Sequence, residues 1–121
     1  MSSKLIFTCT WGAAEPERAT LPFVAANIAA TAGQDAVVLC TIEGVRLGVK
    51  RAADEVAAPG LPKLGELMSQ YIANNGAVWL CGACTKPRGI TEDDLRDGAV
   101  IVGAAKVVEE IVGGAKTVAF A

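Results

Sequence analysis

The sequence contains no histidine, and this absence excludes several classes of active site. Ser-His-Asp triads, Cys-His pairs and histidine acid/base catalysis all need imidazole, as do zinc sites with histidine ligands. Any chemistry that the chain performs must therefore rest on thiols, carboxylates, lysine and arginine.

Long apolar runs and an excess of positive charge are also missing. Although 52% of the residues are hydrophobic, no apolar run approaches the roughly twenty residues that a membrane-spanning helix needs. The formal net charge is −2 and no basic stripe is present, which argues against nucleic-acid binding. Residues 1–4 lack the apolar segment of a secretion signal. We therefore expect a cytoplasmic protein with neither a membrane nor a nucleic-acid partner.

The length and composition predict one small α/β domain. A chain of 121 residues can build one hydrophobic core but not two, so we assign residues 1–121 to a single domain. Alanine, valine and glycine supply much of the hydrophobicity, which suits a parallel sheet covered on both faces. The four cysteines come without an export signal, so we expect free thiols rather than structural disulfides.

Short β-prone runs alternate with segments of helical periodicity. Strands are predicted at 4–10, 35–42, 77–81, 99–102 and 116–121. Helices are predicted at 16–33, 45–51, 63–75, 91–97 and 103–112, of which 45–51 is partly exposed. Strands joined by short helical crossovers are parallel. The sequence therefore predicts a three-layer α/β fold with a five-stranded, mainly parallel sheet and helices on both faces.

Two local patterns refine this prediction. Thr91 and Asp94 match a capping box, with aspartate in the usual place of glutamate. Four apolar residues of the last helix recur at helical spacing and are predicted to face the core: Val107, Val108, Ile111 and Val112.

A Cys-x-x-Cys motif follows the third predicted strand. Cys81 ends the apolar run and Cys84 completes the motif, while Gly82, Pro87 and Gly89 interrupt any continuation of the strand, so we predict a loop. A single free cysteine most often serves as an inert, buried hydrophobe. Two thiols at this spacing on one loop favour a functional pair instead.

Three further residues are candidates for substrate binding near these thiols. Lys86 and Arg88 lie within a few residues of the pair, and neighbouring cations favour the thiolate, which attacks sulfur, carries a persulfide or binds metal. Trp11 follows the first strand and could cover the edge of the sheet where the thiols lie.

The other two cysteines also fall near strand ends. If their strands are neighbours, Cys9 and Cys40 could share one edge of the sheet with Cys81, because reacting groups gather at the carboxyl ends of parallel strands. We favour the simpler interpretation that both are packing residues, since free cysteine is usually buried.

The residues alone leave several functions open. One thiolate could carry sulfane sulfur as a persulfide, or Cys81 and Cys84 could cycle between dithiol and disulfide. A four-thiolate zinc or iron–sulfur site fits least, because only one Cys-x-x-Cys exists. A binding or scaffold protein without chemistry is a further alternative. We predict no cofactor and no metal.

The sequence also resembles a known family, the DsrE/DsrF-like family with its YchN-like members. The resemblance covers nearly the whole chain in element order and is most specific at Cys-Gly-Ala-Cys-Thr-Lys-Pro-Arg-Gly-Ile and Asp-Gly-Ala-Val-Ile-Val-Gly, between about 79 and 103. It implies a five-stranded fold with a flavodoxin-like outline, assembly into homotrimers or homohexamers or into hetero-oligomers, and sulfur donor and acceptor proteins as partners.

The resemblance also implies roles for individual residues. Cys81 matches the cysteine that accepts sulfur as a persulfide in the relay subunits, and Cys84 matches the second cysteine of the YchN-like branch. A sulfurtransferase activity is therefore a hypothesis. Which thiol is the nucleophile, and whether the two form a disulfide, stays open at this point.

Overall fold

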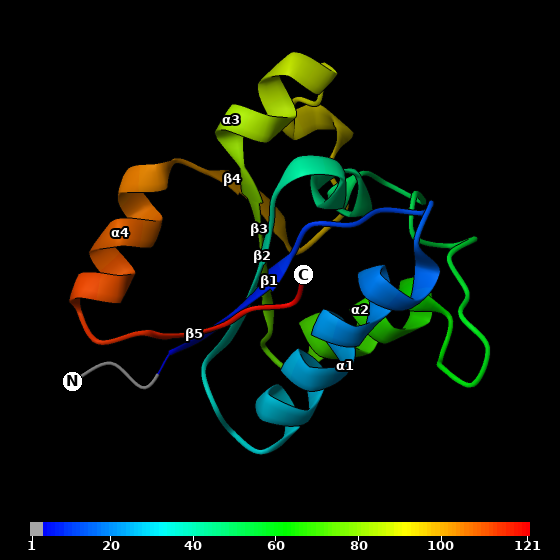
Figure 1. Ribbon diagram of the computed structural model, residues 1–121, viewed down its shortest axis with the longest axis horizontal. Coiled ribbons are helices and arrows are strands. Elements are labelled where there is room, and N and C mark those ends of the chain that lie inside the picture. The colour runs from blue at the N-terminus through cyan, green and yellow to red at the C-terminus, as the bar shows by residue number, and fades with distance from the viewer. Residues whose placement is uncertain (1–3) are drawn as a thin grey trace.

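Five parallel strands form one sheet in the computed structural model, which describes residues 4–121 (Figure 1). The strands are β1 (Leu5–Cys9), β2 (Ala36–Cys40), β3 (Ala77–Cys81), β4 (Ala99–Val102) and β5 (Lys116–Val118). Their order in the sheet is β4-β3-β2-β1-β5, and every pairing is parallel. All five predicted strands are therefore confirmed, although the last is three residues shorter than expected. The carboxyl ends of the strands share one edge of the sheet.

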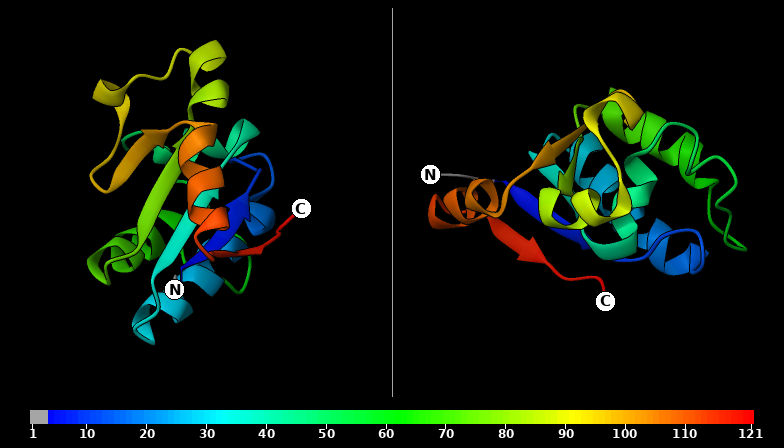
Figure 2. Two further views of the ribbon diagram at one scale, coloured as in Figure 1. Left: turned by 90° about the vertical axis from the view of Figure 1, so that its left-hand side faces the viewer. Right: turned by 90° about the horizontal axis from the view of Figure 1, so that it is seen from above.

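Helices cover both faces of this sheet, as predicted. Figure 1 looks nearly along the sheet, with α1 (Pro16–Thr31) and α2 (Leu64–Ala73) on one side and α4 (Ala104–Val112) on the other. In the side view of Figure 2, α4 crosses in front of the strands. The remaining helical segments are short: η1 (Ile42–Gly48), α3 (Gly82–Thr85), η2 (Lys86–Arg88) and η3 (Glu92–Asp94). None of the helices within residues 4–121 is long and apolar enough to cross a membrane.

The two faces of the sheet differ in how deeply they are buried. Alternate strand residues such as Phe7, Val38 and Val78 form the main core with α1 and α2. The intervening residues Ile6, Val37 and Trp79 form a smaller cluster on the α4 side, to which Val107 contributes.

The prediction for the inner face of the last helix is therefore only partly right. Val107 packs against the sheet, but Val108, Ile111 and Val112 are 58%, 44% and 82% exposed. The helical period identifies an apolar face, but it does not say whether the same chain covers that face.

The predicted helix at 45–51 is instead the 3-10 helix η1, and it begins three residues earlier. Val45 and Leu47 are buried, so this segment belongs to the core more than its mixed sequence indicates. Its turn lies directly on the end of β1: a Cβ atom added at Gly44 would stand 2.2 Å from the carbonyl oxygen of Cys9. Only glycine permits this approach, which fixes η1 beside the carboxyl edge of the sheet.

The capping box is confirmed, but the helix that it begins is shorter than predicted. The Thr91 amide donates a hydrogen bond of 2.8 Å to the Asp94 carboxylate, and η3 then ends at Asp94. The chain pairs instead with the end of η1, because the Lys50 amide donates to the Asp94 carbonyl and the Arg96 amide donates to the Gly48 carbonyl. This pairing competes with continuation of the helix as far as residue 97.

The close approach at Gly44 generates a stability prediction. We expect Gly44→Ala to lower the free energy of unfolding by about 2–3 kcal/mol, because the added methyl group meets rigid backbone and the turn must move. Gly113→Ala is the matched control, since the nearest contact of a Cβ atom there is an ordinary 3.4 Å and the backbone φ is −75°. Urea unfolding of both variants tests the difference, and equal midpoints would contradict the packing described here.

Candidate functional site

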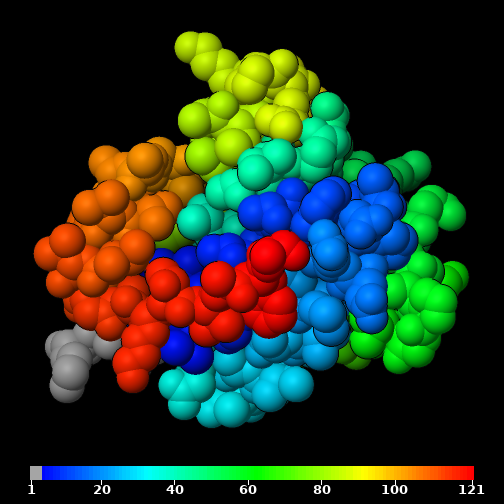
Figure 3. Space-filling view, in the orientation of Figure 1, coloured from blue at the N-terminus to red at the C-terminus, as the bar shows by residue number. Residues whose placement is uncertain are grey.

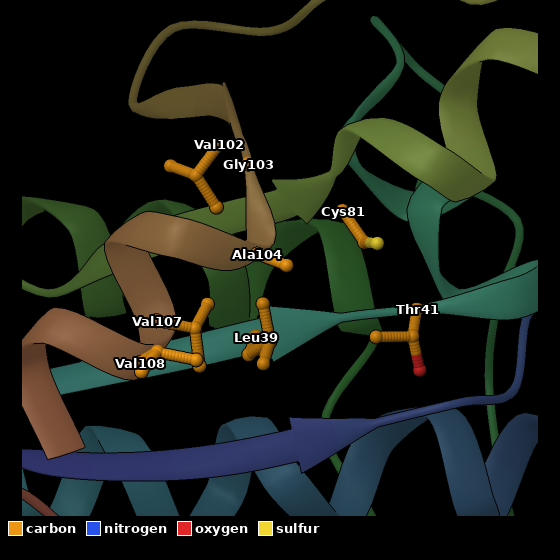
Figure 4. Close-up of a pocket in the computed structure, with 8 residues that line it drawn as sticks. All are labelled: Leu39, Thr41, Cys81, Val102, Gly103, Ala104, Val107 and Val108. Carbon is orange, nitrogen blue, oxygen red and sulfur yellow. The ribbon is translucent and has the colours of Figure 1, made fainter.

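Cys81 lies at the carboxyl end of β3, and its half-buried side chain faces the α4 side of the sheet. There it lines a pocket of about 200 Å³ (Figure 4). The other lining residues come from the end of β2, the end of β4 and the first turns of α4: Leu39, Thr41, Val102, Gly103, Ala104, Val107 and Val108. The thiol is thus presented to an opening at the carboxyl edge of the sheet.

The lining of this pocket is almost wholly apolar. Among residues 4–121, no charged side chain lines it, and Thr41 contributes the one side-chain hydroxyl. Figure 4 shows the labelled side chains extending from Cys81 and Thr41 at one end to Val102, Val107 and Val108 at the other. The sequence analysis identified Cys81 but not this lining, because the pocket joins three elements that are distant along the chain.

Cys84 lies in a short helix rather than in the predicted loop. The four residues Gly82–Thr85 form α3 directly after β3, η2 follows, and Gly89 ends it with φ of 69°. Pro87 is tolerated because the first positions of a helix have no partner for an amide hydrogen. Cys84 is half-buried, and both thiols are free. This segment stands out at the top of the molecule in Figure 3.

Arg88 fastens this segment to η1. Its Nη1 donates a hydrogen bond of 3.0 Å to the Cys84 carbonyl, and its Nε donates one of 2.7 Å to the Glu43 carboxylate. Glu43 also accepts a bond of 2.9 Å from Arg46, and the Arg88 guanidinium, followed by that of Arg46, holds the pKa of Glu43 below its ordinary value. The charge of Arg88 is therefore partnered by Glu43. Lys86 is exposed and makes no ion pair with any residue in the described part of the chain.

Glu43 was missed by the sequence analysis, which left it between the predicted strand at 35–42 and the predicted helix at 45–51. The available signal was its position directly after the predicted strand at 35–42, at the edge where the thiols were expected. Only the fold shows that a residue 45 positions away in sequence holds Arg88 and, through it, the carbonyl of Cys84.

Trp11 lies in a neighbouring pocket rather than in the lining of the Cys81 pocket. Its ring packs under the Arg18 guanidinium at 5.3 Å, and it lines a hollow of about 570 Å³ with residues that include Ile42 and Glu43. The structure therefore brings Cys84 and Arg88 together through a hydrogen bond, whereas Trp11 lines a different pocket, to which Glu43, the partner of Arg88, also contributes. A role for Trp11 in substrate binding stays a prediction.

Cys9 and Cys40 are packing residues, as the favoured interpretation had it. They are paired in register on neighbouring strands, and both are fully buried in the main core beneath α1 and α2. The hydrogen bond with Cys9, followed by burial, raises the pKa of the Cys40 thiol. Because Cys81 faces the opposite side of the sheet, the three thiols do not share one edge site.

The same separation bears on the four-thiolate hypothesis. Cys9 and Cys40 are fully buried in the main core, whereas Cys81 opens to the pocket on the α4 side, so the four sulfur atoms do not fit one tetrahedral thiolate site. Within residues 4–121, no group of three or more cysteine and acidic side chains is placed to hold a metal ion.

Comparison with known proteins gives one family and two sets of relatives. A sequence model of the DsrE/DsrF-like family matches residues 3–120. Uncharacterized protein MJ0760 of Methanocaldococcus jannaschii is 29% identical over 101 residues, which are 84% of this chain and 37% of the relative. Uncharacterized protein MK0008 of Methanopyrus kandleri is 35% identical over 83 residues, which are 68% of this chain and 64% of the relative. The chain thus covers less than two thirds of either relative.

Two solved structures share the fold. The crystal structure of the YchN protein from E. coli superposes with a TM-score of 0.78 at 19% identity and covers 99% of this chain and 100% of that one. The structure of protein MTH1491 from Methanobacterium thermoautotrophicum, of unknown function, has a TM-score of 0.75 at 15% identity and covers 98% and 99%. At these identities the likeness concerns the fold alone.

The burial of the four thiols predicts their order of reactivity. We expect iodoacetamide to modify Cys81 and Cys84 in the native protein, because both are half-buried, and to spare Cys9 and Cys40 until the protein unfolds. Peptide mapping by mass spectrometry, with and without denaturant, measures this order. Modification of Cys9 or Cys40 at the rate of Cys81 under native conditions would show that the core assignment is wrong.

Proposed function

The chain belongs to the DsrE/DsrF-like family, and on that premise we propose that it is a small sulfur-relay protein carrying sulfane sulfur as a persulfide on Cys81. The family is generally associated with sulfur relay. The single observation that carries the proposal for this chain is the half-buried thiol at the carboxyl end of β3, facing a pocket. Donor and acceptor are other proteins or small thiols that reach this edge of the sheet.

The relay needs no oxidant, because each step exchanges one S–S bond for another. The Cys81 thiolate attacks the outer sulfur of a donor persulfide, R–S–SH. An S–S bond forms to Cys81 while the donor's S–S bond breaks, and the electron pair leaves with the donor as RS⁻. An acceptor thiolate then attacks the outer sulfur of Cys81–S–SH, and Cys81 leaves as thiolate.

Neighbouring residues have supporting parts in this proposal. Lys86 is exposed and would attract an anionic donor, whereas Arg88 holds the turn that carries Cys84 through the Cys84 carbonyl.

Cys84 follows Cys81 by three residues, so the persulfide could also react in a second way. Attack of the Cys84 thiolate on the inner sulfur of the persulfide would form a disulfide and release HS⁻. A dithiol/disulfide function is therefore the alternative. Free thiols suit a reducing compartment, and we propose the cytoplasm.

Loading with a persulfide donor tests the proposed relay. After anoxic incubation with glutathione persulfide, we expect the intact mass to rise by one sulfur atom in the wild type and in Cys84→Ser, but not in Cys81→Ser, because Cys81 is the thiol at the pocket. Thiocyanate released by cyanide measures the sulfane sulfur independently. A loss of two protons on mild oxidation, without sulfur gain, would favour the redox alternative. No change in either assay would favour a binding or scaffold protein.

We also propose that the chain assembles into a homotrimer or homohexamer. Exposed apolar residues concentrate on α4, where Ile111 and Val112 near its carboxyl end lack cover from the described chain, while Val108 borders the Cys81 pocket. Such a surface is commonly buried between subunits.

The assembly is tested by light scattering coupled to size-exclusion chromatography. We expect the wild type to elute as an oligomer and Val112→Glu to dissociate, because a carboxylate would be buried at the contact. Ala57→Glu, in an exposed loop far along the chain from α4, is the control and should leave the oligomer intact. A monomeric wild type would refute the proposal.

A further inference from the structure

The pocket beside Cys81 is larger than the proposed persulfide requires. A persulfide adds one sulfur atom to the thiol, whereas the pocket measures about 200 Å³. A dry apolar cavity of about 150 Å³ is enough to hold a benzene molecule. The space next to the thiol therefore fits a ligand of several heavy atoms.

The lining restricts the chemistry of that ligand. No charged side chain from residues 4–121 lines the pocket, and Thr41 offers one hydroxyl. An oxyanion or a charged organic group placed there would lose its hydration without gaining hydrogen bonds, which is unfavourable. Linked sulfur atoms are soft and polarizable and need few hydrogen-bond partners, so an apolar lining suits them.

The pocket extends from the Cys81 thiol toward the surface of the protein. In Figure 4, Cys81 stands at one end of the lining residues, with Leu39 and Ala104 between it and Val107 and Val108. Val108 is 58% exposed, so the far end of the pocket reaches the surface. A linear chain attached to Cys81 could run along this lining and present its end to an acceptor.

From these observations we propose that the pocket holds a chain of sulfane sulfur atoms bonded to Cys81, and that inorganic polysulfide is a substrate of the site. This inference rests on the proposed persulfide at Cys81 and extends it. The Cys81 thiolate attacks HS–S–S–S⁻ at the sulfur next to the SH group. The bond to that group breaks, HS⁻ leaves with its electron pair, and Cys81–S–S–S–S⁻ remains. The apolar lining then favours protonation of the terminal sulfur, because it disfavours charge.

Filling the pocket separates this proposal from simple persulfide relay. Ala104→Leu introduces a larger side chain into the lining, and Ala105→Leu makes the same change at an exposed neighbour that does not line the pocket. Leucine is a strong helix former, so both variants should keep α4. Each protein is incubated anoxically with sodium tetrasulfide, freed of excess reagent and analysed by intact mass and by cyanide release of sulfane sulfur.

The wild type and Ala105→Leu are expected to gain two or more sulfur atoms, Ala104→Leu a single one, and Cys81→Ser none. The sulfane content of Ala104→Leu should fall to roughly half or less of the wild-type value, since its pocket no longer has room for the chain. Unchanged loading of Ala105→Leu excludes a general effect of leucine in α4.

Other outcomes overturn the proposal in distinguishable ways. A single sulfur on the wild type, with none on Cys81→Ser, would refute the chain and leave the relay intact. Chains of equal length in the wild type and Ala104→Leu would show that the pocket does not hold them. A third outcome is that every protein gains only a single sulfur atom and that Ala104→Leu reacts more slowly than the wild type with an aryl persulfide. This outcome would identify an apolar organic donor as the ligand of the pocket instead. Equal loading of Cys81→Ser and wild type would refute both the chain and the relay.

Discussion

The parallel register of the sheet is the constraint on which the position of the reactive thiol depends. Because β2, β3 and β4 run in the same direction, their carboxyl ends bring residues 39–41, Cys81 and Val102 together, although they are far apart in sequence. The crossover from β4 then begins with Gly103 and α4, which completes the pocket wall. An antiparallel neighbour for β3 would place a different strand end beside Cys81.

Strand alternation divides the three cysteines of the strands between two environments. Successive strand residues point to opposite faces, so Cys9 and Cys40 face the main core while Cys81 faces α4. The buried pair has a raised Cys40 pKa and no access to solvent, which suits packing rather than chemistry. Burial in one sheet thus keeps the thiols of Cys9 and Cys40 inert and leaves that of Cys81 accessible.

The sequence predicted the elements well and the contacts between them less well. The strands were found because each is a short apolar run with a clear boundary, and Thr91 and Asp94 were found because a capping box is local. The shortened helix after Asp94, the buried position of η1 and the exposed face of α4 were not found. Each depends on a segment distant in sequence, such as the pairing of residues 48–50 with 94–96.

For the candidate site, too, the sequence predicted local features but not the contacts between distant segments. Cys81 and Cys84 were identified from spacing, because the motif is contiguous. The end of the strand was also predicted, but the loop expected from Gly82 and Pro87 is instead the short helices α3 and η2. Glu43 was not identified, since its partner Arg88 lies on another element. The pocket was not anticipated either, because valine and leucine at strand ends look the same in sequence whether they fill a core or surround an opening.

The helix α4, which forms one wall of the pocket, is less buried than the strands that form the other wall. None of the residues of α4 is fully buried. Val107 packs against the sheet, Glu110 pairs with Lys4 at 3.1 Å, and the Lys106 ammonium lies over the Trp79 ring at 5.9 Å. Helices with so little burial are the first to open in local unfolding, which does not require the core to melt. Cys81 is therefore bordered on one side by the strands of the sheet and on the other by a helix with no fully buried residue, so the two walls of its pocket differ in how firmly the rest of the chain holds them.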